Sequence, residues 1–412
     1  MALVVQKYGG TSVGSTDRIK NVARRAVAAQ QKGNQVVVVL SAMSGETDRL
    51  ISLANEIDSR HNRREHDILV SSGEQVSIAL LAMAIENLGV KAISYLGPQI
   101  PILTDNAHSR ARIIEIRGER ILKSLADGCI VVVAGFQGVD EHGDITTLGR
   151  GGSDTSAVAV ATALSADVCE IYTDVDGIYT TDPNICSQAR KLKCISYDEM
   201  LELASLGAKV LQIRSVEFAK KCGIPIHVRS SFSESQGTIV CKEDEGMEKA
   251  IVSGVAYDKN EAKITICGIP DRPGIAAAIF SAISTKGIVV DMIIQNISEK
   301  GLTDLTFTVP KLDYELALAS LQEINPEIGA HDINGDRDIA KVSIVGIGMR
   351  THAGVATRMF AALAHENINI MMISTSEIKV SCVIAEKYTE LAVRVLHQEF
   401  DLAKEAQDVC SD

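Results

Sequence analysis

The stretch Thr147–Ser156 combines three glycines with an arginine and an aspartate, a pattern suited to anion binding. Its glycines are Gly149, Gly151 and Gly152. They leave the backbone free to adopt positive φ, and Ser153 and Asp154 are well placed to cap a following helix. A helix N-terminus attracts anions, and Arg150 adds a charged fork that fits a carboxylate or a phosphate. We interpret the stretch as the floor of an active site; the structural alternative is a strand-to-helix connection with a surface arginine.

A second cationic, glycine-rich segment, Lys7–Ser12, directly follows the first predicted strand. Backbone N–H groups of the turn at Gly9 and Gly10 could hold transferring oxygens, and Lys7 could balance the charge that develops on them. The chain has no Walker A sequence and lacks the His-Arg-Asp and Asp-Phe-Gly elements of protein kinases. The segment therefore indicates phosphoryl transfer outside those two classes, unless the glycine turn is purely structural.

Two further loops could form walls of the same pocket. Ser41–Thr47 follows the second predicted strand and places small hydroxyl residues around a glycine. Ser71–Glu74 precedes a predicted helix and puts Glu74 in its first turn, where the carboxylate could neutralise a substrate ammonium group. The structural alternative is that Glu74 only complements the helix dipole.

The loop Thr173–Pro183 follows another predicted strand and mixes hydroxyl and acidic side chains with Tyr179. Its acids do not have EF-hand spacing, so we interpret it as a loop at the edge of a nucleotide and not as a calcium loop. Lys209 offers a second internal cation, for which a solvated helix lysine is the alternative.

These loops follow short, almost wholly apolar runs, as expected for strands buried on both faces of a sheet. The predicted strands are Ala2–Val5, Val36–Leu40, Ala92–Tyr95, Ile130–Ala134, Cys169–Tyr172 and Ile226–Val228. The predicted helices are Asp17–Gln31, Ser77–Leu88, Ile113–Leu125 and Asp198–Phe218. The alternation indicates βαβ units in a mostly parallel sheet, which binds ligands at the carboxyl ends of its strands.

The composition is that of an ordinary globular protein with more than one domain: 412 residues, 46% hydrophobic and 23% charged. A net charge of −12 argues against partners such as nucleic acid or an anionic membrane. There is no signal peptide and no long apolar run, and the nine cysteines are scattered. No histidine cluster has metal-site spacing, so Mg²⁺ would arrive with ATP. We expect a cytoplasmic protein without a metal site of its own.

The alternating pattern ends in a polar, acidic stretch near Glu234–Glu248, where we place the main domain boundary. Beyond it, Ile264–Ala276 matches Val342–Ala356, and the second copy carries two extra loop residues. Each copy reads as a strand, a glycine loop, a helix, and then further strands and a helix, consistent with βαββαβ. A period this long indicates a duplicated small domain.

Taken together, these segments resemble the bacterial aspartate kinases, which join an amino-acid-kinase catalytic domain to tandem ACT domains. The resemblance spans the whole chain and rests on Lys7–Ser12, Ser41–Met43, Ser72–Glu74, Thr147–Asp154 and Tyr172–Pro183. It implies a three-layer αβα catalytic domain with a mostly parallel central sheet, followed by two βαββαβ ferredoxin-like ACT domains. The implied ranges are 1–245 for the catalytic domain, 263–338 for the first ACT domain, and 249–262 plus 339–412, interleaved, for the second.

The resemblance also implies a reaction. The β-carboxylate of L-aspartate attacks the γ-phosphorus of MgATP, giving 4-phospho-L-aspartate and ADP. This is the first step of lysine, threonine, methionine and diaminopimelate biosynthesis. A carboxylate is already ionised at neutral pH, so catalysis needs positioning and charge neutralisation and no general base.

The same resemblance assigns roles to individual residues. Lys7 and Lys209 act near the transferring group, and Asp154 organises the two lysines. Glu74 takes the amino group of aspartate. The implied ATP-binding residues are Lys7, Tyr8, Gly9, Gly10, Thr173, Asp174, Tyr179, Asp182, Lys209 and Val210. The implied aspartate-binding residues are Ser41, Thr47, Glu74, Arg150, Gly151, Gly152 and Ser153, with Arg150 and Ser153 on the α-carboxylate. Asn184 stands where family members often carry arginine, which puts one ATP contact in question.

The repeat resembles the ACT domains through which this family senses lysine and/or threonine. The implied effector residues of the first domain are Asp271, Pro273, Gly274, Ile275, Ala276, Asp291 and Gln295. Those of the second are Met349, His352, Ala353, Gly354, Val355, Asn369 and Ile370. The second loop has His-Ala-Gly where relatives often have His-Pro-Gly. The alternative is a duplicated packing module that binds no ligand.

The resemblance further implies a homodimer through the ACT domains. Met247, after the acidic stretch, resembles the internal start that gives some relatives a separate C-terminal subunit, in which case the assembly is a heterotetramer. One rival function is a kinase for N-acetylglutamate, glutamate or a nucleoside monophosphate; Glu74 and Arg150 together with the tandem repeat argue against it. The other is a catalytically dead amino-acid sensor, against which Lys7 and Asp154 argue.

Overall fold

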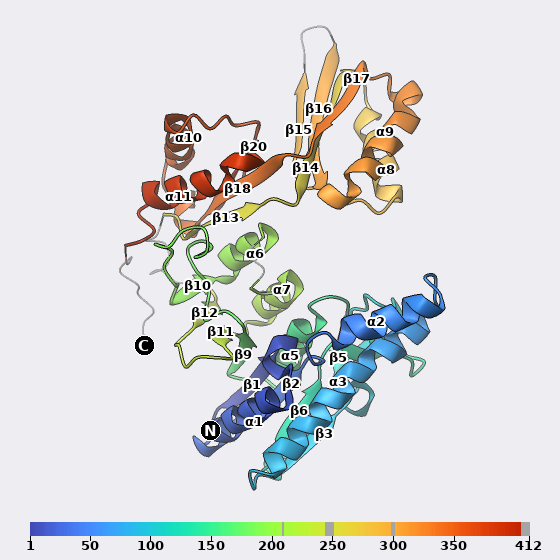
Figure 1. Cartoon of the computed structure of the whole chain (residues 1–412), viewed down its shortest axis with the longest axis vertical. Coiled ribbons are helices and arrows are strands. Elements are labelled where there is room, and N and C mark those ends of the chain that lie inside the picture. Colours follow the sequence, from blue (N-terminus) through green and yellow to red (C-terminus); the bar gives the residue numbers. More distant parts are fainter. Residues whose placement is uncertain (208–209, 244–250, 298–300, 405–412) are drawn as a thin grey trace.

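A computed structural model describes residues 1–207, 210–243, 251–297 and 301–404 of the chain (Figure 1). Its largest sheet has eight strands in the order β10-β12-β11-β9-β1-β2-β6-β3. Every neighbouring pair is parallel except β11 with β12. The strands are β1 (Leu3–Tyr8), β2 (Gln35–Leu40), β3 (Ala92–Tyr95), β6 (Ile130–Ala134), β9 (Val168–Thr173), β10 (Cys194–Ser196), β11 (Ile226–Ser230) and β12 (Thr238–Cys241). The predicted mostly parallel sheet is confirmed.

Helices cover both faces of this sheet, because its central strands are apolar on both faces. In β2, Val36 and Val38 pack under α1 and α3, whereas Val37 and Val39 pack on the opposite side with α4, α5 and α7. The helices are α1 (Thr16–Gln31), α2 (Glu46–Ile57), α3 (Arg63–Glu86), α4 (Glu119–Ala126), α5 (Gly152–Ala163), α6 (Tyr197–Ser205) and α7 (Ile213–Cys222). The result is the expected three-layer αβα arrangement.

Helix α3 is longer than the sequence pattern predicted. It begins after Asn62, whose side chain accepts a hydrogen bond from the Arg64 backbone N–H, and not near Ser77. By length and composition it is the one helix among the described residues that could cross a membrane. It carries the buried acids Asp67 and Glu74 and packs against α1 and the sheet, so one face of the helix belongs to the protein interior.

Two other helix predictions were wrong in part. Residues predicted as the helix Ile113–Leu125 form β5 (Ile113–Ile116) and then α4, because β-branched isoleucines favour a strand and Gly118 separates the two elements. Strand β5 lies in a small sheet with the order β5-β4-β7-β8. The predicted helix Asp198–Phe218 is divided into α6 and α7. The remaining strands of the small sheet are β4 (Ile102–Thr104), β7 (Gln137–Val139) and β8 (Ile145–Thr147).

The C-terminal part contains two antiparallel four-stranded sheets, each covered by two helices (Figure 1). The first has the order β15-β16-β14-β17, and the second has the order β13-β18-β20-β19. The first C-terminal unit, built on the first of these sheets, comprises β14 (Glu261–Pro270), α8 (Ile275–Thr285), β15 (Ile293–Ile297), β16 (Leu302–Pro310), α9 (Tyr314–Ile328) and β17 (Asp332–Asp336). The second comprises β18 (Ile339–Val345), α10 (Val355–His365), β19 (Met372–Thr375), β20 (Lys379–Ala385) and α11 (Thr389–Glu399).

Strand β13 (Gly254–Asp258) precedes the first unit in sequence but pairs with β18 of the second. It also connects the second sheet to the N-terminal part. On the N-terminal side, the buried Glu199 of α6 accepts hydrogen bonds from the Ser253 hydroxyl at 2.5 Å and the Ile347 backbone N–H at 3.1 Å. A buried carboxylate with several donors is costly to disturb, so this contact fixes the second sheet against α6.

Candidate active site

Lys7 lies within β1, one residue before the strand ends, so its predicted place directly after the first strand was wrong. Residues alternate between the two faces of a strand, so Lys7 projects toward α5 while Tyr8 packs on the α1 side. Its Nζ lies 2.6 Å from Oδ1 of Asp154, and each side chain is 12% exposed. The sequence-predicted pairing of Lys7 with Asp154 is therefore present in the structure.

Close packing accounts for the glycine at position 10, whereas a side chain at position 9 would meet only the end of the Lys7 side chain. A Cβ atom at Gly10 would lie 3.0 Å from the carbonyl oxygen of Ala42, in the loop after β2. One at Gly9 would lie 3.4 Å from Lys7 Nζ. The Ser41 N–H donates to the Tyr8 carbonyl at 3.2 Å, which joins the two loops. The carboxyl ends of β1 and β2 thus form one edge, at which Lys7 is held by Asp154.

The glycine turn before α5 has the predicted backbone. Gly149 and Gly151 have φ angles of 77° and 74°, in the left-handed region that favours glycine. A Cβ at Gly151 would lie 2.6 Å from the Gln212 side chain, and one at Gly152 would lie 2.8 Å from Leu148 Cβ. The expected capping role of Ser153 and Asp154 was wrong: Gly151 is the N-cap and makes no side-chain bond. Both residues lie in the first turn of α5, where Asp154 is freed to meet Lys7.

Arg150 and Ser153 differ in exposure. Ser153 is buried, and the glycine at position 135 leaves room for its side chain. Arg150 is exposed, and its carbonyl accepts a hydrogen bond of 2.8 Å from the Gln212 side-chain amide. The backbone at Arg150 is therefore held while its guanidinium stays available to a ligand.

Glu74 lies in the middle of α3, so its predicted place in a first turn was wrong. Its Oε1 accepts a hydrogen bond of 2.9 Å from the Ala42 N–H, and the residue is 2% exposed. Oε2 is buried and has no hydrogen-bond partner among the described residues. Loss of hydration on burial raises the pKa of Glu74 to about 7. A buried carboxylate with one free oxygen is suited to receiving a cationic group.

The other predicted substrate residues lie around the same loop. Ser41 directly follows β2, and its carbonyl accepts a hydrogen bond of 2.8 Å from the Ser77 hydroxyl. Thr47 lies in the first turn of α2, after Gly45 in the left-handed conformation. Both side chains are half-buried. The structure therefore places Ser41 and Thr47 at the two ends of the loop between β2 and α2, and Glu74 of α3 contacts this loop through the Ala42 N–H.

Asp67 was not singled out in the sequence, although it organises the site. It is fully buried and accepts hydrogen bonds from the Thr147 N–H at 2.9 Å, the Thr147 hydroxyl at 2.7 Å and the Ser109 N–H at 2.9 Å. It lies seven residues before Glu74, on the same face of α3. Helix α3 therefore carries both Asp67, which holds Thr147 at the start of the glycine turn, and Glu74, whose Oε2 has no partner among the described residues. The only sequence signal was that spacing of two acids.

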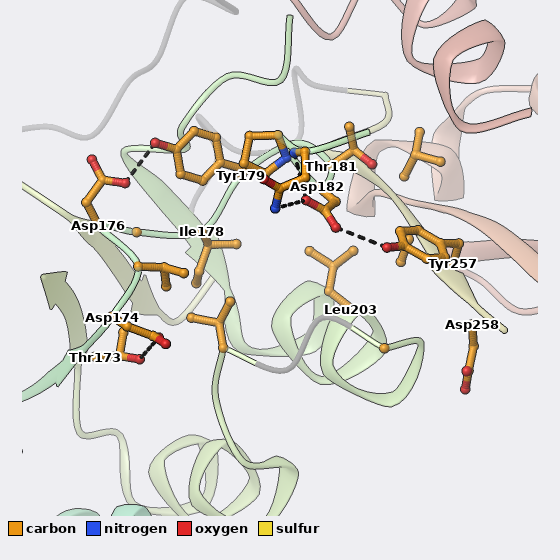
Figure 2. A pocket seen from close by; sticks show the side chains of 18 of the residues that line it. Thr173, Asp174, Asp176, Ile178, Tyr179, Thr181, Asp182, Leu203, Tyr257 and Asp258 are labelled. Atoms are coloured by element: carbon orange, nitrogen blue, oxygen red, sulfur yellow. Dashed lines mark hydrogen bonds between the residues drawn. The ribbon is translucent and has the colours of Figure 1, made fainter. Parts of the chain in front are cut away.

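The predicted nucleotide loop lines a cavity of about 650 Å³, shown in Figure 2. Of the predicted residues, Thr173, Asp174, Tyr179, Asp182 and Val210 line it. The Tyr179 hydroxyl donates to Asp176 at 2.8 Å, which is a contact inside the loop. Lys209 lies outside the described residues.

Asn184 and a strand from the C-terminal part also line this cavity. The Asn184 backbone N–H and side-chain amide both donate to Oδ1 of Asp182, at 2.9 Å and 3.0 Å. Asn184, which stands where family members often carry arginine, thus contacts its own loop. Residues 255–260, in and after β13, form the opposite wall. Sequence reasoning missed them because they lie beyond the acidic stretch, about seventy residues after the loop.

The first predicted effector loop encloses a smaller cavity of about 330 Å³. The predicted residues that line it are Asp271, Pro273, Gly274, Ile275, Ala276 and Gln295. Asp291 is not among the lining residues; it pairs with the buried Lys341 of β18. Lys341 also lies 3.0 Å from Glu261. Asp291 therefore joins the two C-terminal units.

The second predicted effector loop has the same backbone design. Gly354 has a φ angle of 87° and is the N-cap of α10, as Gly274 is for α8. His352 Nδ1 lies 2.7 Å from the Gly348 carbonyl oxygen, which closes the loop on itself. Asn369 and Ile370 precede β19 and do not lie on it. The remaining residues of this predicted group are Met349, in a 3₁₀ turn, and Ala353 and Val355, which flank Gly354.

Comparison with known proteins shows the family to which this chain belongs. Residues 2–230 match the amino acid kinase family, and residues 264–324 and 342–400 match the ACT domain. An aspartate kinase of Pseudomonas putida is 59% identical over 98% of each chain, and an aspartokinase of Corynebacterium glutamicum is 49% identical over 99% of this chain and 98% of that one. The chain belongs to the aspartate kinases of the amino acid kinase family.

The fold agrees with solved structures of that family. The crystal structure of E. coli aspartokinase III in complex with aspartate and ADP is similar with a TM-score of 0.79 and 26% identity, over 96% of this chain and 99% of that one. The structure of Clostridium acetobutylicum aspartate kinase is similar in fold, with a TM-score of 0.80 and 23% identity over 97% of this chain and all of that one. The αβα catalytic fold followed by ACT units is thereby confirmed.

Proposed function

We propose that Lys7, Asp154 and Glu74 carry the transfer of the γ-phosphoryl group of ATP to the β-carboxylate of L-aspartate, giving 4-phospho-L-aspartate and ADP. One observation carries this proposal. A mostly buried Lys7–Asp154 ion pair lies at the end of β1, and a buried Glu74 with an unpartnered oxygen contacts the loop after the neighbouring strand β2. The E. coli relative solved with aspartate and ADP supports the same two ligands here.

In the proposed complex, Glu74 Oε2 receives the ammonium group of aspartate, because only a cation repays the cost of an ionised buried carboxylate. Arg150 and Ser153 take the α-carboxylate at the N-terminus of α5, with Ser41 and Thr47 lining the same space. The backbone at Gly151 and Gly152 leaves room for this approach. The β-carboxylate is then directed toward the phosphoryl group.

Lys7 neutralises the charge that develops on the transferring oxygens, and Asp154 keeps its ammonium group in place. An oxygen of the β-carboxylate forms a bond to the γ-phosphorus while the bond to the bridging oxygen of ADP breaks. No proton has to be removed from an ionised carboxylate. Tyr8, Gly9, Gly10, Lys209 and the loop 173–182 complete the nucleotide contacts in this proposal.

Mg²⁺ belongs to the proposal through the nucleotide. Within the described part of the chain, no three His, Cys, Asp or Glu side chains are grouped to hold a metal ion. Mg²⁺ is commonly bound by substrate phosphates and water with few protein ligands. We therefore assign the ion to the ATP phosphates.

We also propose the domain division 1–245, 263–338, and 249–262 plus 339–412, which the pairing of β13 with β18 supports. Lysine and/or threonine would bind at the loops before α8 and α10; the E. coli relative solved with lysine supports the first of these effectors. A homodimer through the ACT units is proposed on the resemblance. The internal start at Met247 remains a proposal, since that residue lies outside the described ranges.

One assay tests the reaction. The full-length protein is incubated with ATP, Mg²⁺, L-aspartate and hydroxylamine, and aspartyl hydroxamate and ADP are measured together. We expect both products with L-aspartate and neither with N-acetylglutamate. An enzyme preparation that binds ADP but forms no hydroxamate from aspartate would refute the proposed acceptor.

A further inference from the structure

Three hydrogen bonds, one of them between backbone groups, connect the C-terminal part to the predicted nucleotide loop. The Tyr257 hydroxyl, on β13, donates to Oδ2 of Asp182 at 3.0 Å. The Val255 N–H donates to the Thr180 carbonyl at 2.7 Å, and Thr180 Oγ1 lies 2.9 Å from Nε2 of the buried His397 on α11. The loop is therefore held from outside the αβα domain at two of its residues.

Tyr257 is the contact that faces the cavity. It lies among the lining residues together with Asp182, and Figure 2 shows its hydroxyl directed at the Asp182 carboxylate. The other oxygen of Asp182 accepts both hydrogen bonds from Asn184. Asp182 is thus fixed by three donors, and only one of them, Tyr257, comes from another element of the fold.

A fixed carboxylate at the edge of this cavity suits a neutral polar group of a nucleotide, such as ribose hydroxyls, which donate hydrogen bonds to carboxylates. A carboxylate that rotates freely would have to be ordered when the ligand binds, and this ordering costs part of the free energy that the hydrogen bonds contribute. We propose that Tyr257 is a positioning residue for nucleotide binding: it orients Asp182 and makes β13 a wall of the ATP cavity. The inference rests on the proposed function in assigning this cavity to the nucleotide.

The placement of Tyr257 has a consequence for regulation. Val255 and Tyr257 pair with Ile344 and Val342 of β18, the strand that leads into the second predicted effector loop. A displacement of that sheet would move the Tyr257 hydroxyl relative to Asp182. The affinity for the nucleotide is then the property that this sheet changes directly. The affinity for aspartate depends on loops at the other end of the site.

The test uses full-length Tyr257→Phe, which removes the hydroxyl and keeps the ring. Tyr314→Phe is the matched control, since Tyr314 lies on α9 of the first ACT unit and lines none of the cavities described here. Steady-state rates are measured with ATP and with aspartate varied separately, and ADP binding is measured by calorimetry. We expect Tyr257→Phe to raise both the KM for ATP and the Kd for ADP about 3- to 10-fold, the loss of one hydrogen bond to a charged group. Its kcat and its KM for aspartate stay within about twofold of wild type.

A second variant separates positioning from folding. In Asp182→Asn the target carboxylate is absent, so adding Tyr257→Phe to it should raise the Kd for ADP by less than twofold. Equal ADP affinity in wild type and Tyr257→Phe would overturn the inference while leaving the aspartate kinase reaction intact. So would an equal loss of affinity for ATP and aspartate, or full additivity in the double variant. A wild-type protein that turns over aspartate but binds nucleotide without protection of residues 173–184 from hydrogen exchange would overturn the cavity assignment itself.

Discussion

Lys7 Nζ lies 2.6 Å from the Asp154 carboxylate, although the two residues are far apart in the sequence. β1 supplies the lysine at its carboxyl end, and the first turn of α5 supplies the aspartate, just after the left-handed glycine at 151. The pair is mostly buried, so its charges are weakly screened and its geometry is well defined. The ion pair therefore holds the lysine ammonium group at the end of β1.

The first prediction concerns that lysine. Lys7→Ala should lower kcat for aspartate phosphorylation at least about 100-fold, because a fixed cation at the transferring group is lost. Lys20→Ala is the control, since Lys20 is 60% exposed on α1. Coupled assays of ADP release measure both. A Lys7→Ala enzyme with the wild-type rate would refute the assigned role.

Asp154 tests the same pair from the other side. Asp154→Asn keeps Lys7 but removes the charge that holds it, so we expect kcat to fall about 10-fold or more. Because the two residues act together, the double variant with Lys7→Ala should be hardly worse than Lys7→Ala alone. The readout is kcat for all four proteins of the cycle. Independent, multiplicative losses would show that Asp154 acts on something other than Lys7.

Glu74 gives a pH prediction. Its pKa near 7 means that the carboxylate is ionised above about pH 7 and neutral below it. If it receives the ammonium group of aspartate, kcat/KM for aspartate should fall about tenfold per pH unit below that pKa, while kcat at saturation changes less. Glu74→Gln should flatten this limb; Glu86→Gln, exposed at the end of α3, should not. An acid limb that survives in Glu74→Gln would assign it to another group.

The same residue gives a stability prediction of opposite sign to its functional effect. A carboxyl group whose pKa is raised from 4.5 to about 7 on folding lends stability below pH 4.5 that is lost as the pH rises through 7. Glu74→Gln removes this loss. The difference in unfolding free energy between Glu74→Gln and wild type should therefore shift in favour of the variant by about 1–3 kcal/mol as the pH rises from 4.5 to 8. Urea unfolding at both pH values measures it, and a pH-independent difference would contradict the buried, ionisable state.

Much of this architecture follows from local patterns in the sequence. Runs such as Val36–Leu40 are typical of strands buried on both faces, and the glycine-rich turns at 9–10 and 149–152 mark places where the backbone bends or approaches another segment closely. These features are local, so period and composition predict them. The substrate assignments came from resemblance to a family.

What the sequence did not predict depends on long-range contacts. Glu74 was placed in a first turn because the charged run before it hides the apolar face of α3. Asp67, Tyr257 and Lys341 contact partners that are 80, 75 and 50 residues away in the sequence, respectively. No periodicity encodes such pairings; only the packed fold brings the partners together.

Asp67 leads to a further prediction. Its carboxylate holds Thr147 and Ser109, so Asp67→Asn replaces an acceptor by a donor opposite two buried N–H groups. We expect a loss of about 1–3 kcal/mol in unfolding free energy and a higher KM for aspartate, because the turn before α5 loosens. Asp48→Asn, exposed on α2, is the control. Unchanged KM with reduced stability would limit Asp67 to a folding role.

The last prediction concerns the small cavity before α8. The loop around the cavity of about 330 Å³ ends at the N-terminus of α8, which favours a carboxylate. Gln295 faces this loop from β15 and offers both a donor and an acceptor. Gln295→Ala should therefore raise the concentration of lysine or threonine needed for half-inhibition about 10-fold, each variant being compared with its own uninhibited rate. The matched control is Gln322→Ala, an exposed position on α9 of the same unit. Inhibition curves with lysine, threonine and both together identify the effector. Identical curves for Gln295→Ala and wild type under all three conditions would show that feedback acts elsewhere.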